Sequence, residues 1–304
     1  MKVGLPRELL SMERIALLKE AIDAMAPGIQ WIHDPPAKGP EPLFLEGDAC
    51  LPFKKMVRSS LSLLKEVDAL ILPRIAELDG FLMCPNFRAL PDIVSMNKEK
   101  MEIIENLPVI SPLVKDKGRD DMTHAAYEAV RLLYGKSPSV IDNKPGQGLH
   151  GEINVPEKDL SKTIALIGHP YVLADSKLNS GVPDLLRNAG FDTILPGDVP
   201  FSELDALAGS RDYYAKKMYW RPGREILGAF LYFLKERPPA GIIQLVAFNC
   251  GVEALLRIEL MSLYKRMNAP LPYMVLVCDE HAQRDHVVTR VEAFLDIIHG
   301  IRIE

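Results

Sequence analysis

The stretch KTIALIGHPYVLADSKLNSGVPDLLRNAGFDTIL, residues 162–195, decides the fold class of this chain. It opens with a short apolar run, Thr163–Ile167, that predicts a buried strand. A helix is predicted around Val182–Ala189, and a further strand over Thr193–Leu195. A strand, a crossover helix and a second strand are typical of a βαβ unit, which predicts a parallel sheet with helices on its faces.

The same alternation of apolar runs and amphipathic helices continues on both sides of this stretch. Further strands are predicted at Lys2–Leu5, Gln30–His33, Ala69–Pro73, Pro108–Ile110, Ile242–Val246 and Tyr273–Val277. Further helices are predicted from the apolar spacing Ile15, Leu18, Ile22 and Met25, and over Cys50–Glu66, Thr123–Leu133, Arg224–Lys235, Val252–Arg266 and a last segment to His299. The pattern along the whole chain therefore predicts an α/β protein.

The periodic spacing of apolar residues is absent between Tyr134 and Leu160, which predicts a linker. We expect an N-terminal lobe over residues 1–135 carrying Cys50 and Cys84, a linker over 136–160, and a C-terminal lobe over 161–304 carrying Cys250. The predicted fold class is two doubly wound, Rossmann-like lobes with parallel sheets and a cleft between them. Such sheets bind ligands at the carboxyl ends of their strands, where the strand order reverses, so we expect the site there.

Composition excludes several classes of function. The 304 residues are 48% hydrophobic and 25% charged with a net charge of −5, the profile of a globular protein, and no basic stripe favours nucleic acid. The start MKVGLPREL lacks the apolar core of a signal peptide, and the longest apolar run, near Leu227–Leu234, is too short to span a bilayer. These features predict a cytoplasmic protein.

Three of the four cysteines adjoin proline or glycine where a helix is expected to begin: Cys50 in GDACLPFKK, Cys84 in FLMCPNF and Cys250 in FNCGVE. A helix start offers a thiolate backbone N–H donors and a favourable dipole, so these cysteines can be soft metal ligands. The alternative is the usual one for a free cysteine, a buried apolar thiol. The chain has no CxxC pair, no clustered ferredoxin spacing and no GxxxxGK[ST] loop.

Other polar residues follow the predicted strands and are candidates for the same edge. Glu253, His169 and His281 are candidates for a fourth ligand, for a group near the ligands or for catalysis, and a favourable charge at a helix start is the alternative role of Glu253. The remaining candidates are Asp175, Asn179, Asp279, Glu280, Tyr219, Trp220, Arg221 and Arg74, for which capping, turns and core packing are the alternatives.

Several segments, in order along the whole chain, carry a family resemblance. They are KVGLPREL, DACLPFKK, ALILPRIAELDGFLMCPNFRALPDIV, IGHPYVLADSKLNSGVPDLLRNAGF, IQLVAFNCG and CDEHAQRDHVVTRVEAFLD. Together they resemble acyl-CoA dehydratase activase-related proteins, of the superfamily of 2-hydroxyacyl-CoA dehydratase subunits and double-cubane-cluster proteins. The chain departs from the family at Ala282–His286, where a glycine-containing stretch is common.

The resemblance implies an oxygen-sensitive protein of anaerobic metabolism that binds one [4Fe-4S] cluster through three cysteines and leaves one iron open. The residues that fit this pattern are Cys50, Cys84 and Cys250, whereas Cys278 stands where the family usually has an aliphatic residue. It also implies a separate activator of actin-like ATPase fold, or another low-potential electron donor, as partner. Since related subunits pair, it implies a homodimer as well.

Three hypotheses for the function follow. The first is an iron–sulfur redox protein that is reduced by an ATP-dependent activator and passes electrons to, or reduces, a small substrate such as an acyl-CoA. The second is a cluster-free, two-lobed binding module for an acyl-CoA or another small ligand. The third is a hydrolase with a cysteine nucleophile and His169 or His281 as its base, which no local motif supports.

Overall fold

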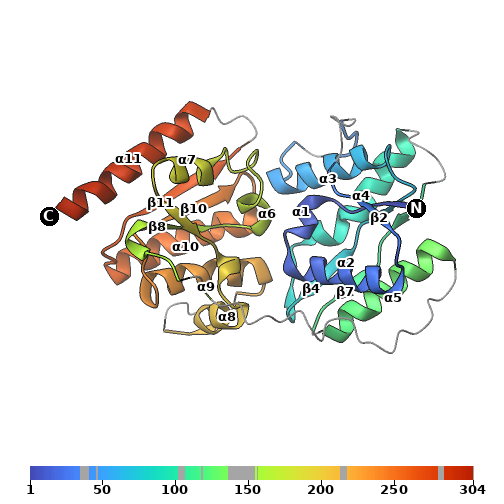
Figure 1. Ribbon diagram of the computed structural model, residues 1–304, viewed down its shortest axis with the longest axis horizontal. Helices are drawn as coiled ribbons and strands as arrows, with labels where there is room; N and C mark the ends of the chain where they lie inside the picture. Colours follow the sequence, from blue (N-terminus) through green and yellow to red (C-terminus); the bar gives the residue numbers. More distant parts are fainter. Residues whose placement is uncertain are drawn as a thin grey trace. The chain divides into compact units, whose positions relative to one another are not determined.

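A computed structural model describes residues 1–34, 41–45, 47–101, 107–117, 119–135, 155, 157–212, 218–279 and 284–303. The chain forms two compact units (Figure 1). The first comprises Met1–Ala49 and Phe53–Gly151, and the second comprises Cys50–Pro52 and Glu152–Glu304. Of the predicted linker 136–160, only Val155 and residues 157–160 are among the described residues.

The first unit is built on a parallel sheet of strand order β2-β1-β3-β6, with β1 (Lys2–Gly4), β2 (Gln30–Ile32), β3 (Ala69–Ile71) and β6 (Val109–Ile110). A second, three-stranded sheet has the order β5-β4-β7, with β4 (Arg74–Leu78), β5 (Phe81–Leu82) and β7 (Leu113–Lys115). The helices are α1 (Arg7–Leu10), α2 (Glu13–Met25), α3 (Leu51–Leu63), α4 (Pro85–Lys100) and α5 (Arg119–Tyr134). The strand order reverses at β1, which has β2 on one side and β3 on the other.

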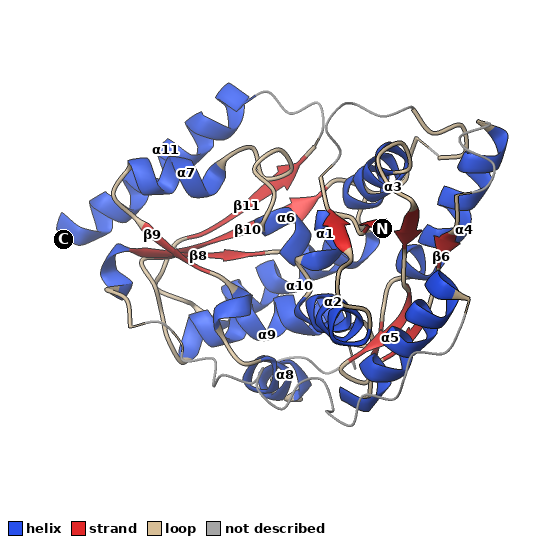
Figure 2. Cartoon of the chain, turned by 45° about the vertical axis from the view of Figure 1, so that its right-hand side comes forward, coloured by secondary structure: helices blue, strands red, loops and turns tan. Residues whose placement is uncertain are grey.

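The second unit is built on one parallel sheet of order β11-β10-β8-β9, with β8 (Thr163–Ile167), β9 (Asp192–Ile194), β10 (Gly241–Ala247) and β11 (Tyr273–Cys278). Its helices are α6 (Pro170–Leu173), α7 (Val182–Asn188), α8 (Phe201–Gly209), α9 (Arg221–Lys235), α10 (Gly251–Met267) and α11 (Arg284–Ile303). Helices α7 and α11 cover one face of this sheet, and α9 and α10 cover the other (Figure 2). The predicted fold class, doubly wound α/β units with parallel sheets, is confirmed.

The core of the second unit explains why its sequence pattern is so clear. Strands β8 and β10 are buried along their whole length, as expected for parallel strands with helices on both faces. Helix α9 is buried from Pro222 to Leu234. It packs against α8 at Gly228, where a Cβ atom would lie 2.1 Å from the Leu204 carbonyl oxygen. Among the described residues, no helix is long and apolar enough to cross a membrane.

The segment Cys50–Pro52 differs from the predicted domain division, which placed Cys50 in the first lobe. These three residues pack with the second unit. The physical reason is a backbone hydrogen bond in which the Leu51 N–H donates to the Phe248 carbonyl oxygen over 3.1 Å. Leu51 and Phe248 both belong to the second unit, so this hydrogen bond lies within it.

Candidate functional site

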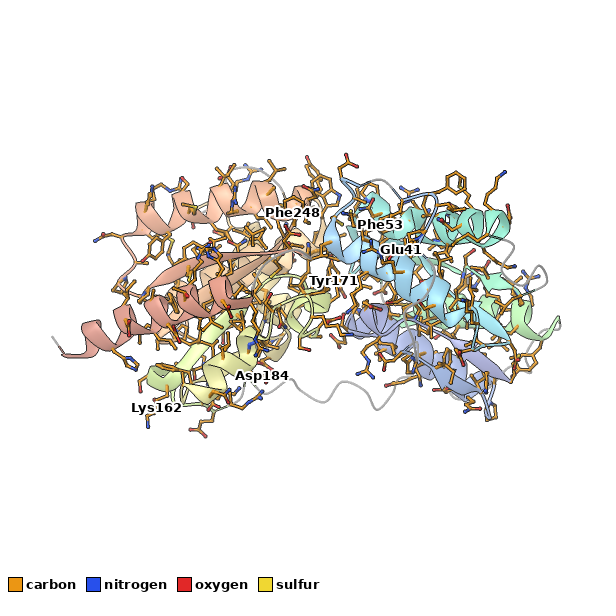
Figure 3. The ribbon with its side chains drawn as sticks, turned by 90° about the horizontal axis from the view of Figure 1, so that it is seen from above. Glu41, Phe53, Lys162, Tyr171, Asp184 and Phe248 are labelled. Carbon is orange, nitrogen blue, oxygen red and sulfur yellow. The ribbon has the colours of Figure 1, made fainter. Side chains whose placement is uncertain are left out.

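The candidate site lies at the carboxyl edge of the second sheet, between β8 and β10, where the strand order reverses. Strand β8 leads into Gly168 and His169, and β10 leads into the turn Phe248–Cys250. The residues Tyr171 and Phe248, labelled in Figure 3, belong to the two segments that leave this edge. This is the place where doubly wound sheets bind ligands.

Backbone geometry brings the two segments close together. A Cβ atom at Gly168 would lie 2.6 Å from the Leu245 carbonyl oxygen, so only glycine permits this approach of β8 to β10. After β10, Asn249 has a φ of 58°, in the left-handed region, and the Cys250 N–H donates to the Ala247 carbonyl oxygen. Cys250 thereby becomes the N-cap of α10.

Three side chains converge here, from the N-cap of α6 after β8, from the turn after β10 and from α10. His169 Nε2 lies 3.2 Å from Cys250 Sγ and 3.8 Å from Glu253 Oε2. One candidate ligand atom from each residue lies within 4.8 Å of the other two. His169 and Glu253 are buried, with 2% and 0% of their surface exposed, and Cys250 is partly buried. The structure thus brings together two candidates, His169 and Glu253, with one of the predicted cysteine ligands.

Burial sets the protonation of these groups. It raises the pKa of Glu253 to about 8, although the backbone N–H groups of Ala247 and His169 lower it. The Ala247 N–H donates to Glu253 Oε2 over 2.6 Å. Burial lowers the pKa of His169 to about 3, so its imidazole is neutral at neutral pH. Among the described residues, no hydrogen-bond partner is found for Glu253 Oε1 or His169 Nδ1.

This donor set fits a soft metal group. Buried polar atoms without partners cost free energy, and a metal ion or cluster is one way to compensate them. Cys250 supplies a sulfur ligand, and His169 Nε2 lies 3.2 Å from that sulfur, within reach of a hydrogen bond to it. A Cβ atom at Gly251 would meet nothing within 4 Å, so there is open space beside Cys250. The hydrogen bond from Leu51 also fixes the backbone next to Cys50 to this turn.

The other two cysteines have different surroundings. Cys84 lies in the first unit as the N-cap of α4, and burial raises the pKa of its thiol. Cys278 ends β11, and burial, together with the nearby Glu253, raises its pKa to about 12. Cys278 is therefore a neutral, buried thiol, as its place in a predicted strand indicated. Ligation of one cluster by Cys50, Cys84 and Cys250 together stays a prediction.

Most of the remaining candidates have structural roles. Asp175 accepts from the Lys177 N–H, and the Asn179 amide binds the Val172 and Leu173 carbonyl oxygens, so both residues hold the loop after α6.

In the same way, Arg74 forms an ion pair with Asp92, and Arg221 pairs with Glu225. Trp220 is the N-cap of α9 and packs against the core, Tyr219 is exposed, and Asp279 directly follows β11. His281 and Glu280 lie outside the described residues.

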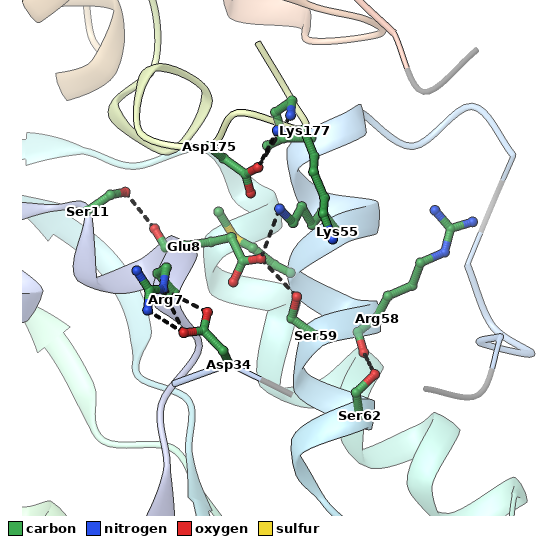
Figure 4. A network of polar contacts seen from close by, with 12 residues as sticks. Arg7, Glu8, Ser11, Asp34, Lys55, Arg58, Ser59, Ser62, Asp175 and Lys177 are labelled. Carbon is green, nitrogen blue, oxygen red and sulfur yellow. Dashed lines mark hydrogen bonds and ion pairs between the residues drawn. The ribbon is translucent and has the colours of Figure 1, made fainter. Parts of the chain in front are cut away.

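Sequence reasoning missed a second polar group, at the carboxyl edge of the first sheet. Glu8 follows β1 and is buried, with 7% of its surface exposed. Its Oε1 atom accepts from the Ser59 hydroxyl over 2.8 Å and lies 3.8 Å from Lys55 Nζ (Figure 4). The signal was the position of Glu8 in GLPREL, two residues after the proline that follows the predicted strand Lys2–Leu5.

Comparison with known proteins adds the family. The model of a family described as CoA enzyme activase uncharacterised domain matches residues 2–199, well over half of the chain. The chain belongs to this family. The resemblance to activase-related proteins of the acyl-CoA dehydratase family is thereby confirmed. Cys50, Cys84 and His169 lie within the matched residues, and Cys250 and Glu253 lie beyond them. No curated protein matches the chain.

Proposed function

We propose that this protein holds one [4Fe-4S] cluster through Cys50, Cys84 and Cys250 and works as an iron–sulfur redox protein. A separate ATP-dependent activator, or another low-potential donor, would supply the electrons. The protein would pass them to a partner or reduce a small substrate such as an acyl-CoA. The observation that carries the proposal is the position of Cys250, at the start of α10 with a neutral, buried imidazole 3.2 Å from its sulfur, in a CoA enzyme activase family.

A bound [4Fe-4S] cluster supplies one-electron transfer and, at an iron without a cysteine ligand, a Lewis-acid position. The protein would supply the ligands of the cluster and the groups that surround them. The dipole of α10 favours the thiolate form of Cys250 at its N-terminus. The Ala247 N–H holds Glu253 in place, and the burial of His169 keeps water away from one side of the sulfur.

The test is anaerobic purification of the full chain, followed by quantification of iron and sulfide and by EPR of the dithionite-reduced protein. We expect near-stoichiometric cluster content in the wild type and its loss in Cys50→Ala, Cys84→Ala and Cys250→Ala. Cys278→Ala is the matched control, because this thiol is buried in β11, and should keep the cluster. A folded, iron-free wild type would contradict the proposal and favour a cluster-free module that binds an acyl-CoA.

A further inference from the structure

The ring of His169 has one well-defined position. The residue is the N-cap of α6 and is followed by Pro170, which restricts the backbone on both sides of their peptide bond. Its imidazole stacks on the Tyr171 ring, with the ring centroids 4.9 Å apart at an interplanar angle of 27°. With 2% of its surface exposed, the side chain is enclosed by neighbouring atoms.

The surroundings of the ring also fix its tautomer. A neutral imidazole has one N–H, and this proton is either on Nδ1 or on Nε2. Nδ1 is buried, and no partner is found for it among the described residues, whereas Nε2 lies 3.2 Å from Cys250 Sγ. A buried N–H without an acceptor is rarer and more costly than a buried acceptor without a donor, so the proton belongs on Nε2.

Of the two acceptors near Nε2, the sulfur is the better placed. Glu253 Oε2 is 3.8 Å away, beyond hydrogen-bond distance, and it already accepts from the Ala247 N–H. The remaining partner for the imidazole N–H is therefore Cys250 Sγ.

We propose that His169 donates its Nε2–H to the Cys250 sulfur and thereby raises the midpoint potential of the cluster that the proposed function places there. This inference rests on the proposed function. His169 acts through Cys250 and is a positioning residue, not an iron ligand. Reduction adds one electron to the cluster and makes its thiolates more negative, so a hydrogen-bond donor stabilises the reduced state more than the oxidised one. No bond to His169 forms or breaks, and the proton stays on Nε2.

The test is an anaerobic redox titration followed by EPR, with dithionite as the reductant. His169→Leu removes the donor at similar volume, and we expect an unchanged iron and sulfide content with a more negative midpoint potential. His169→Gln restores an N–H group and should return the potential toward the wild-type value. His299→Leu is the matched control, because His299 contacts Phe191, directly before β9 at the opposite edge of the sheet, and should leave the potential unchanged.

The outcomes separate this inference from the proposed function. A cluster-bearing His169→Leu protein with the wild-type potential would overturn the role of His169 and leave the cluster standing. A wild type without iron would overturn both. If His169→Leu does not fold, pulsed EPR of the wild type labelled with ¹⁵N-histidine still tests the role of His169. Weak nitrogen coupling in pulsed EPR supports a hydrogen bond to sulfur, and strong coupling, which indicates direct ligation of iron, overturns it.

Discussion

Both units have a buried glutamate at the carboxyl edge of a parallel sheet, but the groups that surround the two carboxyl groups differ. Glu8, in the first unit, accepts from the Ser59 hydroxyl and faces the Lys55 ammonium group. Glu253, in the second, accepts from the Ala247 backbone N–H, and among the described residues its side-chain neighbour of opposite potential charge is His169. Burial keeps His169 neutral, so it brings no positive charge.

The difference indicates what each edge is suited for. A carboxylate with a hydroxyl and an ammonium beside it stabilises the fold around it. At the second edge, a buried carboxyl group lies beside a neutral imidazole and a thiol, and this arrangement lowers the stability of the fold. Clusters of groups with such perturbed pKa values are frequent at functional sites. The second edge is therefore the candidate functional site, and the contacts of Glu8 at the first edge join α1 to α3.

The largest expected effect is a pH dependence of the stability of the second unit in the metal-free protein. Burial raises the Glu253 pKa from 4.5 to about 8, so the unfolded chain releases this proton first, and stability falls as pH rises through that window. Burial lowers the His169 pKa from 6.5 to about 3, so the unfolded chain takes up this proton first, and stability falls as pH drops through that window. The free energy of unfolding should be highest between pH 4.5 and 6.5, where the two slopes oppose each other.

The two tryptophans allow each unit to be followed separately. Trp31 lies in β2 of the first unit and Trp220 in the second, so urea unfolding can be read from Trp220 fluorescence in a Trp31→Phe background. Glu253→Gln should remove the loss of stability between pH 6.5 and about 8. A loss that persists unchanged in this variant would show that Glu253 is not its cause.

The predicted elements that agree best with the structure are the buried ones. Strand β8 spans Thr163–Ile167, as predicted, and β10 extends the predicted Ile242–Val246 by one residue at each end. A strand with helices on both faces must be a continuous apolar run, and such a run is visible in the sequence. Strand β6, Val109–Ile110, lies within the predicted Pro108–Ile110, whereas β5, with two residues, was not predicted and is too short to show any periodicity.

Two other features of the structure, the extent of α4 and the contact between His169 and Cys250, could not be predicted from the local sequence pattern. Sequence analysis expected a helix to begin at Cys84 but not its extent over Pro85–Lys100, because Pro91 lies inside α4 and proline is usually a helix breaker. The contact between His169 and Cys250 joins residues 81 positions apart. The sequence indicated that both residues lie at strand ends, but only the packing of β8 against β10 shows that they meet.

The second prediction compares the glycines at the two sheet edges. A Cβ atom at Gly168 would lie 2.6 Å from the Leu245 carbonyl oxygen, which belongs to the backbone of β10 and has little room to move. A Cβ atom at Gly4 would lie 2.8 Å from Leu70 Cδ1, the end of a flexible side chain. Because overpacking typically costs about 1–3 kcal/mol, we expect Gly168→Ala to destabilise the second unit by about 3 kcal/mol and Gly4→Ala the first by about 1 kcal/mol.

The same tryptophan reporters measure both glycine variants. Gly251→Ala is the control within the second unit, because a Cβ atom there would meet nothing within 4 Å. Its free energy of unfolding should stay near the wild-type value. Equal losses in Gly168→Ala and Gly251→Ala would contradict the close approach of β8 to β10.

The smallest effect is expected at the first edge, from Ser59→Ala. This change removes the hydroxyl that donates to Glu8 over 2.8 Å, but Lys55 remains 3.8 Å from the same carboxylate oxygen. We therefore expect a loss of about 1 kcal/mol, the net contribution of a typical hydrogen bond. Ser62→Ala, on the same helix, removes only a bond to the Arg58 carbonyl oxygen and should cost less. If Trp31 fluorescence gives the two variants the same stability, Ser59 is not what holds Glu8, and the two edges differ less than their contacts indicate.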